Sequence, residues 1–266
     1  MILTLLTDYG TQDDFVGVCH GVIRTICPEA QVVDITHGIG RHDVRHGALV
    51  LGNALRYMPV GVHVAVVDPQ VGTERRGVAL RCADDRLLVG PDNGLLSRAW
   101  ERCGGVLEAV DISRSPHRLE PVSATFHGRD VFAPVAAHLA AGAELADAGE
   151  ALDPDELATL ELPAPRREAN VVVAHALAID RYGNVTTDLL HEDLADTGLT
   201  LGRGVRIESH ERRRLAKFTQ TFADVPPGGL LIYEDAYRAL AVAVNRGDAA
   251  ATLGVAPDDE LRLSPA

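Results

Sequence analysis

The feature that most constrains the fold is a change in the repeating pattern of the chain after Gly142. Before it, short apolar segments typical of β-strands alternate with amphipathic segments whose apolar residues recur at helical spacing. That alternation predicts an α/β layer fold. After it, short strand-like segments are separated by glycine and proline turns, which predicts a compact barrel or sandwich. We therefore predict an N-terminal α/β domain of residues 1–165, with a mixed central sheet, and a smaller C-terminal β-barrel-like domain of residues 166–266.

The expected elements follow from this pattern. In the first domain we expect strands over 2–6, 31–35, 62–67, 77–82, 86–89 and 106–112, and helices over 13–27, 43–58, 95–102 and 129–141. The acidic stretch 146–167, which contains three prolines, is expected to be a linker. In the second domain we expect strands over 170–179, 184–189, 205–210, 230–233, 239–244 and 260–263. The basic cluster Arg212–Arg214 is interpreted as a solvated loop.

Composition narrows the classes of partner. The 266 residues are 46% hydrophobic, enough for a sizeable core, and carry a formal net charge of -13. An acidic protein repels nucleic-acid phosphates and anionic lipids, so neither nucleic acid nor a membrane is an expected partner. The apolar start of the chain before Asp8 is too short for a membrane span or a signal peptide. The four cysteines lack C-x-x-C spacing, which favours free buried thiols in a reducing cytoplasm.

Two aspartates stand where ligands of α/β proteins commonly bind. Asp8 and Asp68 each follow a predicted parallel strand, and the carboxyl ends of such strands form the ligand-binding edge of a sheet. Carboxylates there suit the hydroxyl or ammonium groups of a ligand, and the sequence has no glycine motif for binding phosphate. On pattern alone, a turn-forming role for Asp8 and helix capping by Asp13 or Asp14 stay open.

Arg75, His127 and Gly128 are the remaining candidates for a site. Arg75 and Arg76 follow Asp68 across a turn that contains glycine, so one of them can fold back and keep that carboxylate ionised. His127 precedes a predicted helix, and Gly128 lets the backbone approach a ligand closely. On pattern alone, a solvated arginine and a structural histidine are the commoner outcomes. No serine or cysteine stands in a motif for covalent catalysis.

The histidines do not predict a metal site. His42 and His46 are four residues apart on a predicted helix, a spacing that can bind a metal ion. The H-E-x-x-H motif and an evident third ligand are both absent from the sequence. We therefore interpret this pair as a solvated helix face, and we interpret the other isolated histidines, His37 among them, in the same way.

A series of ordered segments resembles the S-adenosylmethionine (SAM) hydroxide adenosyltransferases, the water-using relatives of the fluorinase and chlorinase. The segments are T-D-Y-G-T-Q-D-D-F, I-C-P-E-A-Q-V-V-D-I-T-H, V-V-D-P-x-V-G-T-x-R-R, G-P-D-N-G-L-L, T-F-H-G-R-D-V-F-A-P-x-A-A-H-L-A, A-I-D-x-Y-G-N-V-T-T-D and A-V-N-R-G-D-A-A. The resemblance spans nearly the whole chain. It implies an N-terminal α/β domain, a C-terminal β-barrel-like domain and a homotrimer, with SAM bound between the N-domain of one subunit and the C-domain of the next.

The resemblance also implies a set of residues that holds the attacking water, and these are Asp68, Arg75 and His127 here. The fluorinase has an aromatic residue in place of Asp68 and Tyr-Ser in place of His127 and Gly128. It also carries a long insertion where this chain has only Ala83–Arg86. These differences favour water over halide as the nucleophile.

Other residues are carried over as substrate-binding residues. Asp8 matches the carboxylate that grips both ribose hydroxyls, and Asp180 and Asn184 match residues that contact the methionine end and the adenine. Asn245 lies in the stretch that lines the adenine pocket. Near E-D-A-Y-R-A the chain departs from the family, so the partner of the methionine carboxylate stays open. The full set of expected substrate-binding residues is Asp8, Asp13, Gly128, Asp180, Asn184, Tyr237 and Asn245.

The sequence therefore predicts a cytoplasmic, metal-independent SAM hydrolase that forms adenosine and L-methionine. SAM is the substrate, and no cofactor is expected. Two alternatives stay open at this stage: a halogenase that forms a 5′-halo-adenosine, and a non-catalytic sensor of SAM or adenosine. A metal-dependent hydrolase is a more distant alternative. Agreement by chance with so many family segments in the same order is improbable, so the functional prediction rests on the family resemblance.

Overall fold

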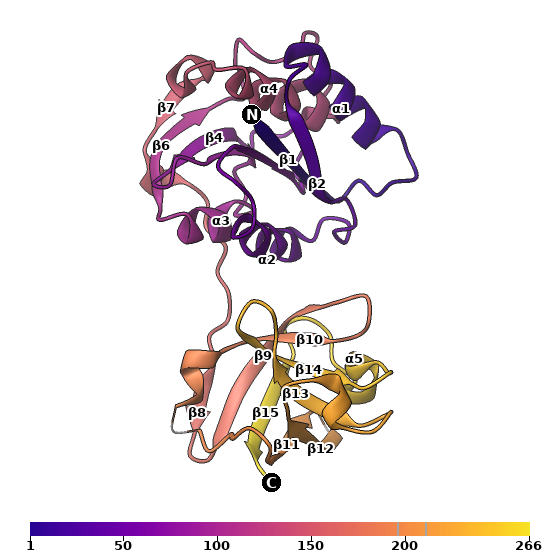
Figure 1. The fold of residues 1–266 in the computed structure, drawn as a ribbon. Helices are drawn as coiled ribbons and strands as arrows, with labels where there is room; N and C mark the ends of the chain where they lie inside the picture. The colour runs from indigo at the N-terminus through magenta and orange to yellow at the C-terminus, as the bar shows by residue number, and fades with distance from the viewer. Residues whose placement is uncertain (196, 211) are drawn as a thin grey trace. The chain divides into compact units, whose positions relative to one another are not determined.

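The computed structural model describes residues 1–195, 197–210 and 212–266. Their contacts divide the chain into two compact units, Met1–Leu160 and Glu161–Ala266, the N-terminal unit and the C-terminal unit (Figure 1). The N-terminal unit is a mixed α/β layer structure with an open sheet, and the C-terminal unit is a closed β-barrel. The predicted fold class is therefore confirmed.

A mixed sheet forms the middle of the N-terminal unit, in the strand order β2-β1-β3-β5-β4-β6-β7. The pairings among β2, β1, β3 and β5 are parallel, and those that join β5, β4, β6 and β7 are antiparallel. The strands are β1 Ile2–Thr7, β2 Gln31–Thr36, β3 Val62–Val66, β4 Gly77–Cys82, β5 Leu87–Pro91, β6 Val106–Asp111 and β7 Glu150–Leu152.

Helices cover both faces of this sheet, as Figure 1 shows. On one face α1 (Phe15–Ile26) and α4 (Ala133–Ala140) share a core cluster with side chains of β1 and β3. On the other face α2 (Val44–Leu55) and α3 (Ser97–Arg102) pack in a second cluster. The central strands are therefore buried on both sides, which explains why they are almost continuously apolar in sequence.

The order of the parallel strands creates a ligand-binding edge. The chain runs from β1 to β2 on one side and then returns through α2 to β3 on the other side of β1. A crevice opens at such a switch point, outside the carboxyl ends of the two diverging strands. Asp8 follows β1 directly and Asp68 lies two residues after β3, so both carboxylates stand at this edge.

Two helix predictions need correction. The helix expected over 43–58 spans Val44–Leu55, and Asp43 caps its start by accepting a hydrogen bond from the amide of His46 at 2.9 Å. His42 precedes this cap and lies outside the helix, so the interpretation of His42 and His46 as a pair on one helix face was wrong. The helix expected over 129–141 is divided into a π-helical turn, η1 (Gly128–Phe132), and α4.

The stretch expected to be a linker is ordered along most of its length. It contains two short 3₁₀ turns and the edge strand β7, which pairs with β6. Asp92 fixes the part of this stretch around Ala158, because the Asp92 carboxylate accepts a hydrogen bond from the amide of Ala158 at 2.8 Å. Arg76 donates to the carbonyl of Glu156 at 2.9 Å. The turn-forming residues of this stretch alone indicate a linker, because a local pattern does not contain its contacts with residues distant in sequence, such as Asp92 and Arg76.

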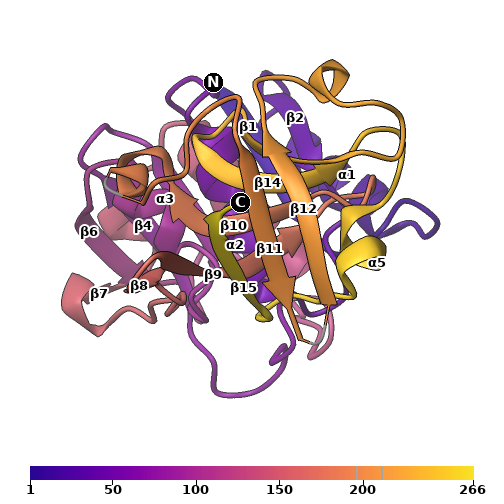
Figure 2. The same ribbon diagram turned by 90° about the horizontal axis from the view of Figure 1, so that it is seen from below.

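The C-terminal unit is a barrel. Among its described residues, the strands close in the order β10-β14-β13-β12-β11-β15-β9, because β9 pairs with β10, and β8 extends the sheet beyond β9. The elements are β8 Arg166–Glu168, β9 Val171–Ile179, β10 Val185–Leu190, β11 Gly204–Ser209, β12 Arg212–Phe218, β13 Leu230–Glu234, β14 Ala239–Val244, α5 Ala249–Leu253 and β15 Glu260–Pro265. Figure 2 shows β11 and β12 as long neighbouring strands.

The strand β12 corrects the interpretation of Arg212–Arg214 as a loop. Its first residues pair with β11, and Glu208 stands opposite Arg213 across the two strands. Three consecutive exposed arginines do not give the hydrophobic alternation by which strands are recognised. All four cysteines are buried and free, as predicted. Within the described residues, no helix has the length and apolar character needed to cross a membrane.

Candidate active site

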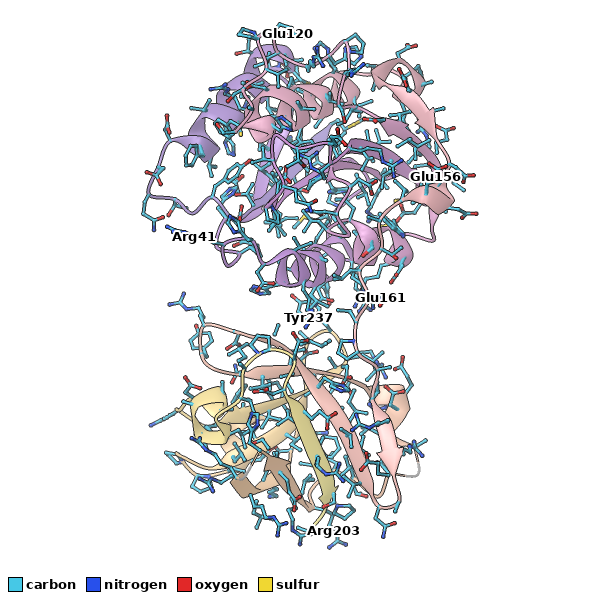
Figure 3. The ribbon with its side chains drawn as sticks, turned by 180° about the vertical axis from the view of Figure 1, so that it is seen from behind. Arg41, Glu120, Glu156, Glu161, Arg203 and Tyr237 are labelled. Atoms are coloured by element: carbon cyan, nitrogen blue, oxygen red, sulfur yellow. The ribbon has the colours of Figure 1, made fainter. Side chains whose placement is uncertain are left out.

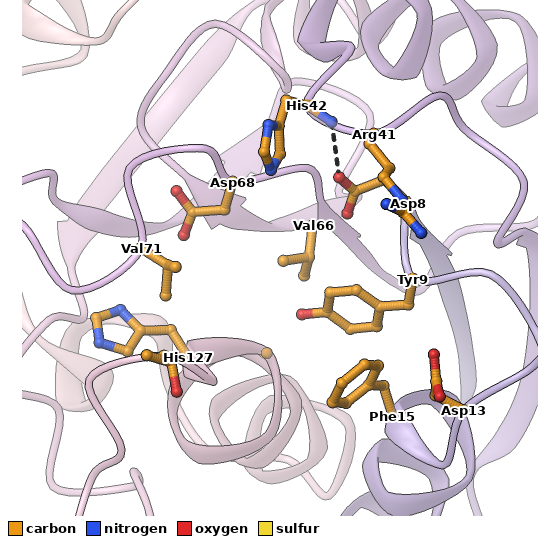
Figure 4. Close-up of a pocket in the computed structure, with 12 residues that line it drawn as sticks. Asp8, Tyr9, Asp13, Phe15, Arg41, His42, Val66, Asp68, Val71 and His127 are labelled. Atoms are coloured by element: carbon orange, nitrogen blue, oxygen red, sulfur yellow. Dashed lines mark hydrogen bonds between the residues drawn. The ribbon is translucent and has the colours of Figure 1, made fainter.

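A pocket of about 300 Å³ opens at the carboxyl edge of β1 and β3. Figure 4 shows Asp68 and His127 on one side of it and Asp8 and Tyr9 on the other. The pocket is lined by Asp8, Tyr9, Asp13, Phe15, Arg41, His42, Val66, Asp68, Val71, Thr125, His127 and Gly128. Carboxylates, aromatic rings and one apolar wall thus surround the same space, a composition suited to a cationic ligand with polar and apolar parts.

Asp8 is held from the loop that precedes α2. Its Oδ2 accepts a hydrogen bond from the backbone amide of His42 at 2.9 Å, the contact drawn in Figure 4. His42 has a φ of 64°, a left-handed conformation that costs energy for a residue other than glycine. The strained backbone directs the amide of His42 toward the carboxylate, so His42 binds Asp8 through its main chain. Its side chain is exposed, as the sequence interpretation expected, and it lines the pocket from a loop and not from a helix face.

Asp68, Arg75 and His127 form one buried cluster. The side chains of Asp68 and Arg75 are only 5% and 3% exposed. Arg75 grips the carboxylate with two groups, Nε donating to Oδ1 at 3.2 Å and Nη2 donating to Oδ2. The same Nη2 lies 3.2 Å from Nδ1 of His127. A bidentate grip of this kind fixes both the charge and the direction of a carboxylate.

Gly72 allows the loop after β3 to fold back onto this cluster. Its φ is +78°, and a Cβ there would lie 2.2 Å from the carbonyl oxygen of Ala124. The loop can therefore pack directly on the segment that leads to His127, and Arg75 reaches both partners. Seven residues separate Asp68 from Arg75, and the predicted return of this loop is what the structure contains.

The surroundings of His127 keep its ring neutral. Burial and, after it, the neighbouring Arg75 cation lower the pKa of His127 below its usual value of 6.5, while Asp68 opposes this effect. A guanidinium has only donors, so Nδ1 of His127 accepts from Arg75 and the neutral ring carries its proton on Nε2. The histidine can thus offer a hydrogen-bond donor beside a fixed carboxylate.

Tyr9 is a pocket residue that the sequence prediction missed. A Cβ on Gly128 would lie 2.1 Å from the Tyr9 hydroxyl, so the ring of Tyr9 rests directly on the Gly128 backbone. The ring also packs against Phe15 and Phe126, with centroids 5.8 Å from each. Burial, with the Cys19 thiol and the carboxylates of Asp8 and Asp68 adding to it, raises the pKa of Tyr9 well above 10. Tyr9 is therefore a neutral phenol that could have been suspected only from its place after Asp8.

Asp13 and its neighbour differ in role. Asp13 lines the pocket, as expected for a substrate-binding residue. Asp14 stands at the N-cap of α1, but its side chain makes no capping hydrogen bond. The capping function that the sequence left open for one of them is therefore absent at Asp14. Arg41, Thr125 and Val71 are further pocket residues for which the sequence carried no distinctive signal.

The other expected substrate-binding residues lie in the C-terminal unit. Asp180 and Asn184 belong to the turn between β9 and β10, where Asn184 Nδ2 donates to Asp180 Oδ2 at 2.7 Å. Tyr237, labelled in Figure 3, stands in the turn between β13 and β14. Asn245 directly follows β14 and donates from Nδ2 to the carbonyl of Val225 at 2.7 Å. Half-buried Tyr233 lies near Asp180, and burial, followed by the charges of Asp180 and Asp235, raises its pKa to about 12.

Two family descriptions match the chain and correspond to its two units. Residues 3–149 match the SAM hydroxide adenosyltransferase N-terminal domain, and residues 174–262 match the C-terminal domain of the same family. The chain belongs to the SAM hydroxide adenosyltransferase family. The resemblance found in the sequence motifs is thereby confirmed, and the pocket at the edge of β1 and β3 lies within the N-terminal domain of this family.

Curated relatives of this chain include proteins with two kinds of name. An (R)-S-adenosyl-L-methionine hydrolase of Salinispora tropica is 49% identical over 98% of this chain and 97% of its own length. Another of that name, from Thermus thermophilus, is 37% identical over 97% of both chains. A fluorinase of an Actinoplanes species is 31% identical over 74% of each chain. An uncharacterised conserved protein from Thermotoga maritima has a similar structure, with a TM-score of 0.92, 35% identity and coverage of 99% of this chain and 100% of its own.

Proposed function

We propose that this protein hydrolyses S-adenosyl-L-methionine to adenosine and L-methionine by attack of water at C5′. The observation that carries the proposal is the buried Asp68–Arg75 pair in contact with His127 at the wall of a pocket lined by carboxylates. The relatives named SAM hydrolases, at up to 49% identity, support the same substrate.

The reaction requires of the enzyme little more than positioning the water and SAM and accepting a proton from the water. The sulfonium of SAM leaves as a neutral thioether, so neither an acid nor a metal ion is needed to assist it. The enzyme has to hold one water oxygen behind C5′ in line with the C–S bond. Positioning of this kind can lower a barrier by roughly 7–11 kcal/mol in favourable cases. The carboxylates of Asp8 and Asp13 favour a cationic ligand, and Asp8 is suited to accept hydrogen bonds from the ribose hydroxyls.

We assign different roles to the two groups around the water. Since Nδ1 of His127 accepts from Arg75, its Nε2–H is the group available to donate to the water oxygen. Asp68, ionised and fixed by Arg75, accepts the proton that the water loses as the C5′–O bond forms and the C5′–S bond breaks. Arg75 positions both partners. General-base assistance of this kind contributes about 10²–10⁴-fold.

Turnover in ¹⁸O-labelled water tests the site of attack. We expect the label in the 5′-hydroxyl of adenosine and none in methionine, because the new bond joins the water oxygen to C5′. Mass spectrometry of both products makes the measurement, and a run in unlabelled water is the control. Unlabelled adenosine from labelled water would rule out the proposed attack.

A halogenase is the second candidate, because fluorinase relatives share 31–32% identity with this chain. Asp68 and His127 argue against it, since a fixed carboxylate repels a halide. Incubation with fluoride or chloride and SAM should still yield adenosine as the main product. A 5′-halo-adenosine as the main product would overturn the hydrolase proposal, and binding of SAM without any turnover would favour the sensor.

The names of the relatives suggest a finer substrate specificity. Those proteins are called hydrolases of (R)-S-adenosyl-L-methionine, the R epimer at sulfur. We propose the same preference here. Separate assays of the R and S epimers, each purified, should give faster turnover of the R epimer, and equal rates would contradict the preference.

We further propose a homotrimer in which the C-terminal unit of one subunit completes the pocket of the next, on the ground of the resemblance in sequence. We also propose that the reaction needs no metal ion and that the protein works in the cytoplasm, where four free thiols stay reduced. Analytical ultracentrifugation should give the mass of three chains. Activity at 25 °C should persist after dialysis against a chelator.

The pH dependence of kcat/KM should report His127. Protonation of Nδ1 removes the acceptor for Arg75 and places a cation beside that guanidinium, so activity falls as the pH drops through the pKa of His127. Burial and Arg75 lower that pKa, so we expect the midpoint of the acid limb below pH 6.5. The variant His127→Asn should lose this limb and much of its rate. An acid limb with a midpoint above pH 6.5, absent from the variant, would contradict the assigned environment.

A further inference from the structure

Three potential metal ligands meet at β2, an edge strand of the N-terminal sheet. They are His20 on α1, Asp34 on the edge strand β2, and His37, which follows β2. Their ligand atoms all lie within 4.8 Å of one another. Oδ1 of Asp34 is 2.8 Å from Nε2 of His20 and 3.2 Å from Nε2 of His37. We propose that these residues bind a divalent transition-metal ion, with zinc as the best fit.

The distances suit a zinc ion. Zinc binds histidine nitrogen and carboxylate oxygen at about 2.0–2.2 Å in a tetrahedral arrangement, so its ligand atoms lie about 3.3 Å apart. The separation of 3.2 Å between His37 Nε2 and Asp34 Oδ1 is close to that value. His20 Nε2 and Asp34 Oδ1, at 2.8 Å, form a hydrogen bond that has to open for the ion to bind between them. Two imidazoles and one carboxylate form a donor set that zinc, nickel and cobalt accept, and that leaves the fourth position to water.

His37 is the observation that points to an ion. Its side chain is only 6% exposed, and its Nε2 is a buried polar atom without a hydrogen-bond partner in the part of the chain that the structure describes. Buried polar atoms are almost always satisfied, so this one needs an explanation. Nε2 faces the carboxylate of Asp34 at 3.2 Å, in a geometry that makes no hydrogen bond. A metal ion between the two would satisfy both.

The opposite nitrogen of His37 is already fixed. Nδ1 lies 2.9 Å from the hydroxyl of Thr7, a buried side chain at the end of β1. Metal-binding histidines almost always anchor their second nitrogen in this way, because the anchor orients the ring toward the ion. The two other ligands are partly exposed, at 34% for His20 and 38% for Asp34, so an ion can enter from solvent.

The site would fasten α1 and β2 to the segment that carries Asp8. Thr7 directly precedes Asp8, and the amide of Gly10 donates to the carbonyl of His37 at 2.8 Å. An ion here would therefore stabilise the N-terminal unit. It lies apart from the residues to which we assign the reaction, so this proposal does not depend on the proposed function.

Calorimetric titration of the metal-free full chain with Zn²⁺ tests the proposal, with Co²⁺ absorption as a report on the ligands. We expect one tight equivalent, Co²⁺ bands of a low-symmetry nitrogen and oxygen site, and a rise in Tm of about 5–10 °C at a hundredfold excess over Kd. His20→Ala, at a partly exposed position, should weaken binding at least tenfold and, at the same Zn²⁺ concentration, reduce the rise in Tm to about half or less. Asp34→Asn, a nearly isosteric change, should do the same.

His210→Ala is the matched control, because His210 pairs with Asp259 at 3.0 Å without a third ligand among the described residues. It should bind the ion as the unaltered chain does. Failure of the unaltered chain to bind Zn²⁺ stoichiometrically would overturn the proposal. Equal binding by His20→Ala and the unaltered chain would overturn it as well, whether or not SAM is hydrolysed.

Discussion

Replacement of Asp68 by asparagine is expected to lower kcat by about 10²–10⁴-fold while SAM still binds. Asparagine preserves the shape of the side chain and can still accept from Arg75, but it cannot take the proton of the attacking water. Asp8 and Asp13 keep their carboxylates in the pocket, so the affinity for SAM should change far less than kcat. Single-turnover rates of adenosine formation measure the chemical step, and equilibrium titration with SAM measures binding.

Loss of a buried charge also destabilises the fold, so the variant needs a control for stability. Removing one partner of a buried ion pair typically costs about 3–5 kcal/mol. Asp92→Asn is the matched change, since Asp92 is also 5% exposed and pairs with the adjacent Arg76 at 2.7 Å, but does not line the pocket. At a temperature where both variants are folded, Asp92→Asn should keep most of its activity. Equal losses in the two variants would show that Asp68 matters only for stability.

Replacement of Gly128 by alanine is expected to lower kcat/KM by about 10²-fold. The added Cβ would lie 2.1 Å from the Tyr9 hydroxyl and 3.1 Å from its Cζ, so the aromatic ring has to move. Tyr9 lines the pocket and packs on Phe15 and Phe126, which limits where it can go. A displacement of about 1 Å in a site that works by positioning can cost a factor of this size.

A double-mutant cycle identifies Tyr9 as the cause. Tyr9→Phe removes the hydroxyl that makes the shortest contact, so adding Gly128→Ala to that background should cost less than tenfold in kcat/KM. Circular dichroism and Tm establish that all three variants are folded. If Gly128→Ala costs the same factor with and without the Tyr9 hydroxyl, then the glycine is needed for another reason, such as direct approach of the substrate to the backbone.

The local sequence pattern was sufficient to predict the elements whose apolar residues recur at regular spacing. The buried strands β1 and β3 are apolar runs followed by Asp8 and Asp68, and the rule for parallel sheets places both carboxylates at one edge. The short turn with a glycine predicts that an arginine folds back onto Asp68, but Arg75 and Arg76 both satisfy that pattern, and the family motif selected Arg75. His127 is different, since 52 residues separate it from Arg75 and only the family motifs joined it to the cluster.

The features that local pattern missed depend on contacts between distant segments. Tyr9 is a pocket residue because Gly128 offers it a surface without a side chain. The strand β12 starts with charged residues and is held by its pairing with β11. His20, Asp34 and His37 come from a helix, a strand and a loop, with no spacing that a metal motif would have. No periodicity within one segment carries information of this kind.

The π-helical turn at Gly128–Phe132 has a consequence for insertions and deletions in this chain. A π turn accommodates one residue more than an α turn, and such turns are frequent at functional sites. Deleting one residue from Gly128–Phe132 would let the turn relax into a regular α-helix continuous with α4. A π turn holds its extra residue within a single turn, so after such a deletion His127 should keep its direction relative to α4 and stay on the wall it shares with Asp68. The same deletion made inside α4, where no extra residue is present, would turn His127 by about 100° about the helix axis.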